Sequence, residues 1–441
     1  NSAACEDKDK AYLIYGVHDA THEIVGTSFN PYSHKIGNEE LENWLHKLLS
    51  NNANFEFSMH EIDGKNVVIF TIQKAVYRPL TFKKEAYIRS GSYKKHLRDV
   101  PVLENKLWSK LNLTAYEELS AVENLDLASA LTRLDYAAYF ERTEIQQPLE
   151  PNNIAHYLIE DRILKPQDNG QYSITNLGAL LFAKKLSEYP HISRKRLRII
   201  QYNGNSRAAS KNDITIENGY AASFDEVIRL IMGILPANDE IVDGIRKNKP
   251  QYPEIIIREL LANALIHQDF TLKGVGPTLE IFDGWFEITN PGDLLIDEMR
   301  IIDNPPKSRN EALAMLMRRC HICEEEGRGW DKIITAAEEN LLPAPQFMNY
   351  PESTKVIVRG FVPLDKMSTN EKIWSCYLHA CLKYSMNDKI TNASLRERFG
   401  VSASSKASIS RIIKTSIEKG LIKPFETNTA PRYMKYIPFW A

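Results

Sequence analysis

The chain has 441 residues, a length that predicts about three domains of ~150 residues rather than a single core. Hydrophobic residues make up 43%, charged residues 25% and aromatic residues 10%, which is typical of a globular protein and excludes disordered, collagenous and coiled-coil chains. The formal net charge is only −2, and no apolar run approaches the ~18 residues of a membrane span, so no membrane partner is expected.

Residues 1–104 are predicted to form an α/β domain. An apolar run at 12–17 indicates a buried strand, and an amphipathic pattern at 39–49 indicates a helix. Two alternating segments joined by Asp63-Gly64 predict a β-hairpin, and a strand at 86–95 ends in a basic Gly/Ser turn. The chain begins with Asn-Ser-Ala-Ala and enters a strand almost at once, which predicts that it starts inside a domain.

Residues 105–196 are predicted to be mainly helical. One helix is expected at 125–138, a second at 152–163 and a third at 177–186, with a hairpin between the last two that turns at Asn169-Gly170. The order helix, helix, hairpin, helix predicts a small winged connector.

Residues 197–365 are predicted to form a two-layer α/β domain, and residues 366–441 a winged helix-turn-helix. The whole chain is therefore predicted to be an α/β multidomain (α+β) protein. In the third domain we expect strands at 197–202, 278–282, 285–289 and 355–361, helices at 222–235, 253–265, 311–319 and from Trp330, and a loop at 290–310. In the fourth we expect helices at 370–384, 393–399 and 406–419, then two strands around Pro431.

The most informative segment is the helix predicted at 253–265. Glu259, Asn263 and His267 are spaced four residues apart, so they share one helical face. A carboxylate and a carboxamide on one face can hold Mg²⁺ and a water beside a triphosphate, because Mg²⁺ prefers oxygen ligands. By itself this spacing also fits an ordinary solvated polar stripe.

The segments that follow favour a nucleotide site. A strand ends in Asn290-Pro-Gly292, a lid-like loop carries Ser308-Arg309-Asn310, and the Gly327-x-Gly329 turn opens a helix. Gly292 would let the backbone approach a base, and the two later glycines would place free N–H groups at a helix N-terminus, where phosphate binds. Each motif is common by itself, whereas their order along the chain is specific.

This order resembles the GHKL ATPases, and more closely the C-terminal ATPase-like domain of RecG-related ATP-dependent helicases and transcriptional regulators. The resemblance covers residues 250–350 and rests on ELLANALIHQDF, ITNPGDL, SRN and EEEGRGWDKI. It implies that Glu259 is the catalytic, water-activating carboxylate and Asn263 the magnesium ligand. It places Asn290 and Gly292 at the adenine box, where Asn replaces the usual Asp and the second glycine is missing. The other cofactor-binding candidates for ATP and Mg²⁺ are His267, Asp269, Arg309, Gly327 and Gly329.

Residues 1–100 resemble the Schlafen AlbA-type domain, whose members bind nucleic acids. The matching segments are YLIYGVHDATHEIVGT, GKNVVIFTIQ and RPLTFKKEAYIRSGS. The family's opening acidic segment is not present in this sequence, so no nuclease residues are assigned. Arg89, Lys94 and Lys95, with Tyr87 and Tyr93 between them, are candidate phosphate and stacking contacts, and the alternative is a capped sheet edge with solvated lysines.

Residues 366–441 contain thirteen Lys/Arg and five Asp/Glu, a net charge of +8, which leaves −10 for the rest of the chain. A helix-turn-helix places its second helix in the DNA major groove, although winged helices also serve as protein–protein modules. The candidate DNA contacts are Lys406, Arg411, Lys414, Lys419 and Arg432. Deleting residues 366–441 is expected to abolish duplex binding and leave ATP binding intact.

The five cysteines are irregularly spaced, which predicts a reducing, cytoplasmic location. The single Cys320-x-x-Cys323 pair does not indicate a zinc site, so Mg²⁺ is the one expected metal. We predict a prokaryotic DNA-binding transcriptional regulator that senses or uses ATP, and a homo-oligomer is compatible with this. The alternatives are a helicase-associated or nuclease component, or a scaffold with a vestigial pocket. The sequence contains no Gly-x-x-x-x-Gly-Lys-Ser/Thr loop, which argues against an autonomous helicase motor.

Overall fold

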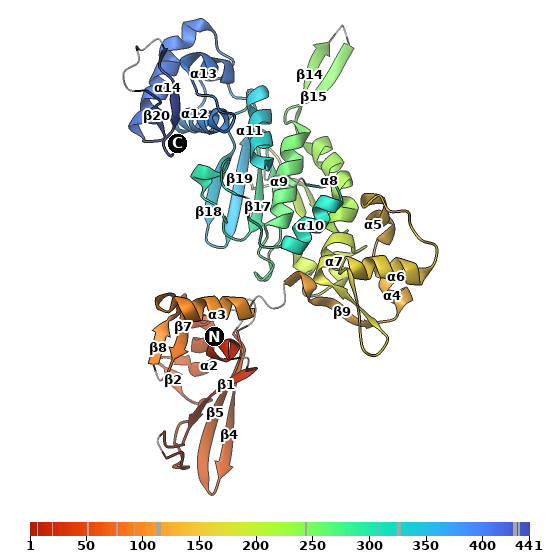
Figure 1. The fold of residues 1–441 in the computed structure, drawn as a ribbon, viewed down its shortest axis with the longest axis vertical. Helices are drawn as coiled ribbons and strands as arrows, with labels where there is room; N and C mark the ends of the chain where they lie inside the picture. Colours follow the sequence, from red (N-terminus) through yellow and green to blue (C-terminus); the bar gives the residue numbers. More distant parts are fainter. Residues whose placement is uncertain are drawn as a thin grey trace. The chain divides into compact units, whose positions relative to one another are not determined.

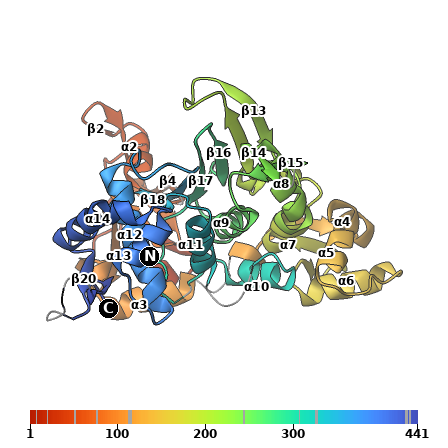
Figure 2. The same ribbon diagram turned by 90° about the horizontal axis from the view of Figure 1, so that it is seen from above.

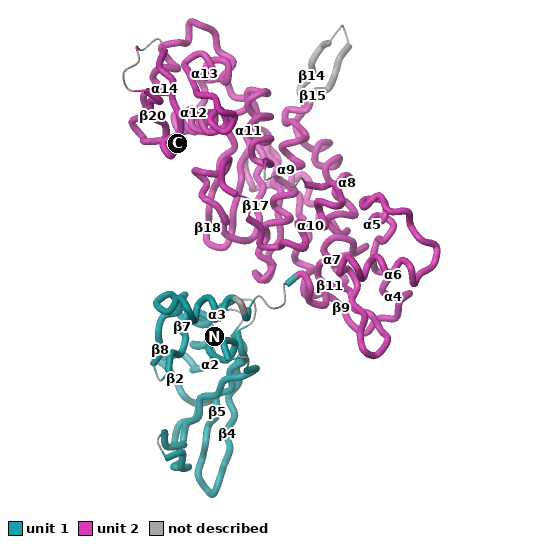
Figure 3. Tube along the Cα trace, viewed as in Figure 1, with its two compact units in different colours: residues 1–116 teal, residues 117–441 magenta. Residues whose placement is uncertain are grey.

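The structure is a computed structural model of the chain (Figure 1). It describes all residues except 7, 20, 51–52, 76–77, 92, 112–115, 243–244, 306, 324–327, 427–429 and 431–432, and the side chains of 109, 238–242 and 245–249. The chain forms two compact units, residues 1–116 and residues 117–441 (Figure 3). Across the described helices, none combines the length and apolar character needed to cross a membrane.

Unit 1 (residues 1–116) contains small antiparallel sheets and three helices. The main sheet has the order β1-β5-β4, and a second has the order β6-β7-β8. The strands are β1 (Lys10–Tyr15), β2 (Lys35–Ile36), β3 (Glu39–Glu40), β4 (Phe55–Ile62), β5 (Lys65–Gln73), β6 (Thr81–Phe82), β7 (Glu85–Ser90) and β8 (Tyr93–His96). The helices are α1 (Ser2–Cys5), α2 (Leu41–Leu48) and α3 (Pro101–Leu111).

The predicted hairpin in unit 1 is confirmed, and the predicted burial of the first strand is wrong. Asp63 and Gly64 join β4 to β5 with positive φ angles of 52° and 72°, as a tight primed turn requires. β1 is an edge strand whose partner in the sheet is β5, and Tyr12 and Leu13 are 61% and 46% exposed. An apolar run indicates a strand but does not show whether that strand lies at an edge or in the centre of its sheet.

Unit 2 (residues 117–441) begins with helices around a three-stranded sheet of order β10-β11-β9. The predicted single helix at 125–138 is instead two helices, because Asp126 caps the first and Asp135 caps the second by accepting a hydrogen bond from Ala138 N at 3.1 Å. The elements are β9 (Ser120–Leu125), α4 (Leu127–Arg133), α5 (Tyr136–Arg142), α6 (Pro151–Glu160), β10 (Leu164–Pro166), β11 (Tyr172–Thr175) and α7 (Asn176–Phe182).

The centre of unit 2 is a six-stranded sheet of order β13-β12-β16-β17-β19-β18, in which β12 and β16 form the parallel pair. α9 packs on β17 between α8 and α11, so helices lie against the sheet in two layers (Figures 1 and 2). The strands are β12 (Arg198–Tyr202), β13 (Ser210–Thr215), β16 (Thr278–Ile281), β17 (Trp285–Pro291), β18 (Gln346–Tyr350) and β19 (Ser353–Arg359), with a separate β14 (Ala237–Val242) and β15 (Ile245–Pro250) hairpin. The helices are α8 (Tyr220–Ile234), α9 (Glu254–Ile266), α10 (Glu311–Arg319) and α11 (Gly329–Glu339).

The end of the chain folds into three helices followed by a two-stranded hairpin. These are α12 (Thr369–Ser385), α13 (Asn392–Arg398), α14 (Lys406–Glu418), β20 (Ile422–Pro424) and β21 (Tyr436–Pro438). Ser368 and Glu371 form a capping box that fixes the start of α12. The helix predicted at 406–419 is confirmed as α14, with Ile409, Ile412 and Ile413 buried, while Pro431 lies outside the described residues. The predicted α/β multidomain class is confirmed.

Candidate nucleotide site

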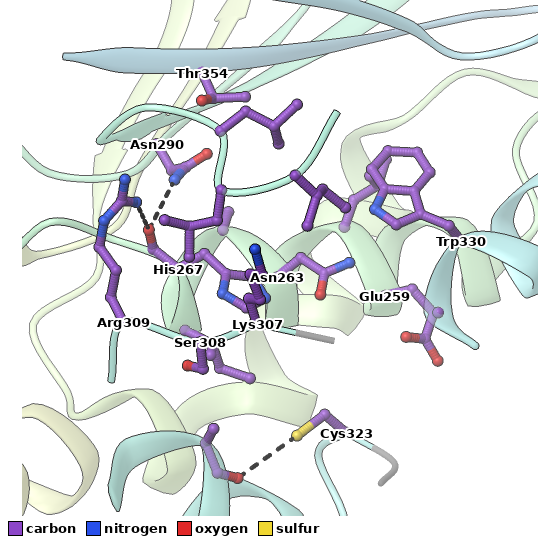
Figure 4. Close-up of a pocket in the computed structure, with 18 of the residues that line it drawn as sticks. Glu259, Asn263, His267, Asn290, Lys307, Ser308, Arg309, Cys323, Trp330 and Thr354 are labelled. Atoms are coloured by element: carbon purple, nitrogen blue, oxygen red, sulfur yellow. Dashed lines mark hydrogen bonds between the residues drawn. The ribbon is translucent and has the colours of Figure 1, made fainter. Parts of the chain in front are cut away.

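A cavity of about 650 Å³ lies over the polar face of α9 in unit 2. Glu259, Asn263 and His267 follow one another along this face, as predicted, and all three line the cavity (Figure 4). Asn290 and Arg309 lie at the His267 end, whereas Trp330 lies at the Glu259 end (Figure 4). The volume falls within the ~300–1,000 Å³ that small-molecule sites occupy.

The lining combines apolar and cationic side chains. Ile288, Ile301 and Val356 are among the apolar residues that face the cavity. Among the described lining residues the basic side chains are Arg162, Lys307, Arg309, Arg318, Arg328 and Lys332, and the acidic ones are Glu259, Asp293 and Glu311. A cavity with an excess of positive charge and a large apolar wall fits a ligand that has both a flat apolar part and an anionic part.

At one end of the cavity, the start of α11 approaches Glu259. Gly329 is the first residue of α11, and a Cβ atom there would lie 2.9 Å from Glu259 Oε2 and 3.7 Å from Asn263 Nδ2. Lys332, one turn later, places its Nζ 3.8 Å from Glu259 Oε1. A glycine at this position therefore lets the positive end of the helix come close to the carboxylate. Gly327 lies outside the described residues.

At the other end, the carbonyl group of the residue that follows α9 accepts hydrogen bonds from two side chains, one on β17 and one further along the chain. The His267 carbonyl accepts hydrogen bonds from Arg309 Nη1 at 3.1 Å and from Asn290 Nδ2 at 3.5 Å, and Arg309 Nη2 donates to the Asp293 carbonyl at 2.6 Å. Burial, with the Arg309 charge second, lowers the pKa of His267 to about 4, so the imidazole is neutral at pH 7. Its Nδ1 is buried and has no hydrogen-bond partner among the described residues.

Asp269 and Gly292, two other predicted cofactor contacts, lie behind the lining rather than in it. Asp269 Oδ1 accepts hydrogen bonds from the N–H and the hydroxyl of Thr271, at 3.0 and 2.5 Å. Gly292 has φ +117°, and a Cβ there would lie 2.8 Å from Arg309 Nη1 and 3.1 Å from Asp269 Cβ. The absence of a side chain at Gly292 therefore leaves room for Arg309 and Asp269 against its backbone.

Several structural residues of the site were not predicted. Asn310 is buried and donates to the carbonyls of Ile266 and Gln268 at 2.6 and 2.8 Å, which caps the C-terminus of α9. Lys332, Trp330 and Thr354 line the cavity. The position of Lys332 could have been predicted from the sequence, because it follows Gly329 by one helical turn. The Asn310 cap depends on tertiary contacts that no local sequence pattern indicates.

The basic residues predicted for DNA contact lie mainly on the surface of α14. Lys406, Arg411 and Lys414 are exposed, and Lys414 lies 3.8 Å from Glu418. Lys419 Nζ donates to Asn370 Oδ1 at 3.1 Å, which ties it to α12. Arg432 lies outside the described residues.

The basic residues predicted in unit 1 do not form one patch. Arg89 and Lys94 are direct cross-strand partners on β7 and β8, so they share a face, and Lys94 Nζ lies 4.5 Å from the Tyr87 ring centre. Lys95 pairs with Ile88 and therefore points to the opposite face. Two of the three predicted cations, together with Tyr87, thus remain as a candidate surface.

Two comparisons with protein families bear on these sites. Residues 1–98 match the family described as "Schlafen, AlbA_2", and residues 274–358 match the family described as "Putative ATP-dependent DNA helicase recG C-terminal". The predicted family resemblance is confirmed. The AlbA-like and RecG C-terminal-like domains indicate a nucleic-acid-related, ATP-binding function. Asn290, Gly292, Arg309 and Gly329 lie inside the second match, and Glu259 precedes it.

Comparisons with individual proteins add less. None of the curated proteins matches the chain. The crystal structure of the DIP2311 protein from Corynebacterium diphtheriae is similar to it, with 15% sequence identity and a TM-score of 0.45, over 92% of this chain and 78% of that one.

Proposed function

We propose that the protein is a cytoplasmic, ATP-binding, DNA-binding transcriptional regulator of the RecG-related type. In this proposal the cavity over α9 holds ATP with Mg²⁺, and residues 366–441 act as a winged helix that binds duplex DNA. The observation that carries the proposal is the cavity itself. It brings Glu259, Asn263 and His267 of one helix face together with Asn290, Arg309 and Gly329 from three other segments.

The residues of the cavity fit a nucleotide. The phosphates would lie at the Glu259 end, where Arg328 and Lys332 line the cavity and the N-terminus of α11 begins. The base would lie at the other end, against the apolar side chains of the cross-strand pair Ile288 and Val356 and beside the polar side chain of Asn290.

The residues also fit Mg²⁺ held largely by the ligand. The described part of the chain has no group of three or more His, Cys, Asp or Glu that could hold a metal alone. Asn263 would therefore supply one protein oxygen, with phosphate oxygens and water as the remaining ligands, which is how Mg²⁺ is usually bound beside triphosphates. When bound, Mg²⁺ neutralises phosphate charge. In this proposal Glu259, whose Oε1 lies 3.8 Å from Lys332 Nζ, would accept a proton from an attacking water.

Nucleotide titration tests the proposal for the cavity. Saturating ATP and Mg²⁺ at about 100 times Kd should stabilise the protein by ~2.7 kcal/mol, read as a rise in Tm. Asn263→Ala should reduce the dependence of binding on Mg²⁺. Glu259→Gln should keep binding and lose any hydrolysis, whereas Glu254→Gln, on an exposed position of the same helix, should change neither. No shift in Tm at millimolar ATP and Mg²⁺ would overturn the proposal.

Duplex binding tests the second part. Five exposed cations on α14 and the hairpin are candidate phosphate contacts: Lys406, Arg411, Lys414, Lys423 and Lys435. If all five contact phosphates, log K should fall with log salt at a slope of about −4 to −5. Arg411→Ala should weaken binding, and Lys366→Ala, which removes one exposed charge before α12, should not. Equal effects of the two variants would contradict the proposed DNA surface.

A further inference from the structure

The loop after β17 lines the cavity on one side and packs against the C-terminal helices on the other. We call residues 293–305, which form one wall of the cavity, the lid segment. Ile296 and Ile301 line the cavity, and both also pack in the hydrophobic core that α12, α13 and α14 build. The lid segment is therefore a shared wall between the cavity and the C-terminal module, defined as residues 366–441.

Polar contacts fix the outer face of the lid segment to the C-terminal module. The Tyr377 hydroxyl on α12 donates to the Met299 carbonyl, and Trp440 Nε1 donates to the same hydroxyl at 3.1 Å. The Arg300 guanidinium lies 4.5 Å from the ring centre of Trp440. Neither Tyr377 nor Arg300 lines the cavity, so these contacts serve the attachment of the lid segment rather than the ligand.

Helix α11 makes a second connection. Its first turn carries Gly329 and Trp330 in the cavity wall, and the Trp330 ring packs on Phe347, another lining residue, at 4.5 Å. In its last turn Glu338 accepts from His379 Nδ1 at 2.8 Å and pairs with Arg398 Nε at 3.1 Å. Eleven residues at ~1.5 Å each make a rod of ~16 Å between the cavity and this buried cluster.

We propose that occupancy of the cavity is energetically coupled to DNA binding by the C-terminal module, through the lid segment and α11. This inference rests on the proposed function and adds its regulation. Close-packed interiors adjust in discrete steps, so a ligand that repositions Ile301 or Trp330 must also alter the packing of α12. Coupling between two sites is reciprocal, so DNA must change nucleotide affinity by the same factor.

The test compares two substitutions on one helix. Tyr377→Phe removes the hydroxyl that holds the Met299 carbonyl, and Tyr384→Phe removes a hydroxyl from the same helix whose side chain is 37% exposed. Duplex Kd is measured with and without a non-hydrolysable ATP analogue and Mg²⁺, and nucleotide Kd with and without duplex. Each pair of measurements gives one factor: the change in duplex Kd caused by nucleotide, and the change in nucleotide Kd caused by duplex. For the unmodified protein and Tyr384→Phe we expect these two factors to be equal and at least about fivefold. For Tyr377→Phe we expect both factors to fall toward one, with nucleotide Kd in the absence of DNA unchanged.

A second pair of variants keeps the test decisive if Tyr377→Phe fails to fold. Arg300→Ala removes the contact with Trp440 together with the ion pair to Asp303 within the lid segment. Arg229→Ala removes an exposed arginine of α8 that donates only to the Asp225 carbonyl of its own helix among the described contacts. Arg300→Ala should lower the coupling and Arg229→Ala should not. If nucleotide binds and duplex Kd does not change, the coupling is overturned and the proposed function stands. If no nucleotide binds, both are overturned.

Discussion

The substitution Gly329→Ala is expected to weaken nucleotide binding at the Glu259 end of the cavity without destabilising the fold. The added methyl group would lie 2.9 Å from Glu259 Oε2, about 0.5 Å closer than ordinary van der Waals contact. In the free protein the Glu259 carboxylate can turn into the cavity and relieve this contact. In the complex the ligand fills that space, so the cost of overpacking falls on binding.

The size of the effect follows from this geometry. Overpacking a filled site costs about 1–3 kcal/mol, which predicts a loss of nucleotide affinity of about 5- to 150-fold. Stability should change in the opposite direction, because alanine is favoured over glycine in a helix by up to about 1 kcal/mol. Tm should therefore stay equal or rise by no more than ~3 °C.

The matched control is Gly233→Ala, at the end of α8, where an added Cβ would meet nothing within 4 Å. Both variants are followed by thermal unfolding and by calorimetric titration with ATP and Mg²⁺. Gly233→Ala should gain similar stability and bind nucleotide as the unmodified protein does. If Gly329→Ala also binds with unchanged affinity, the nucleotide does not occupy the Glu259 end, and the placement of phosphates there is wrong.

Three further predictions concern stability. The native pKa of His267, about 4, lies below the ordinary 6.5, so as pH falls from 7 to 5 the unfolded chain takes up a proton that the native state does not. The free energy of unfolding, measured in urea, should therefore fall by about 2 kcal/mol between pH 7 and pH 5, and this fall should be absent in His267→Gln. Asn310→Ala should lower the unfolding free energy by ~2–4 kcal/mol, since it leaves the buried carbonyls of Ile266, the last residue of α9, and of Gln268 without this donor. A loss below ~0.5 kcal/mol in urea would refute the cap. Deleting residues 366–441 should lower the Tm of the remaining chain, because Ile301 and Ile334 lose their buried neighbours, and an unchanged Tm would contradict this.

The order of motifs along the chain predicted the cavity because helical geometry is local. A spacing of four residues places Glu259, Asn263 and His267 on one face whatever surrounds the helix, and this face lines the cavity. The role of Asn310 could not be predicted in the same way. Its partners, the carbonyls of Ile266 and Gln268, depend on how a distant loop returns to the end of α9, and nothing within either segment indicates that return. The Asp269 contact with Thr271 is local, and a short-range turn of this kind is within the reach of sequence analysis.

The predicted burial of β1 and the single helix predicted at 125–138 were wrong for related reasons. The apolar run of β1 has the composition of a central strand, but its burial depends on which strands flank it, and in the described structure it is an edge. The helix predicted at 125–138 has a continuous helical pattern, yet Asp135 accepts from Ala138 N and starts a new helix. The sequence contains this capping residue inside the apolar period, and a capping aspartate marks a helix boundary more directly than the period that runs through it.

The net charge summed over the residues of the C-terminal module does not equal the charge that its surface exposes. The net charge of +8 on residues 366–441 predicts a basic appendage on an acidic body, yet the side chain of Arg398 is only 2% exposed and pairs with Glu338, which lies outside the segment. Arg359, also outside, pairs with the buried Glu371. These pairs cross the boundary between the module and α11 or β19, so the module is built into unit 2 rather than attached to it. Ile301 and Trp330 of the cavity wall also pack against the hydrophobic cluster that the module builds. We therefore expect deletion of residues 366–441 to weaken ATP binding, rather than leave it intact as the sequence suggested.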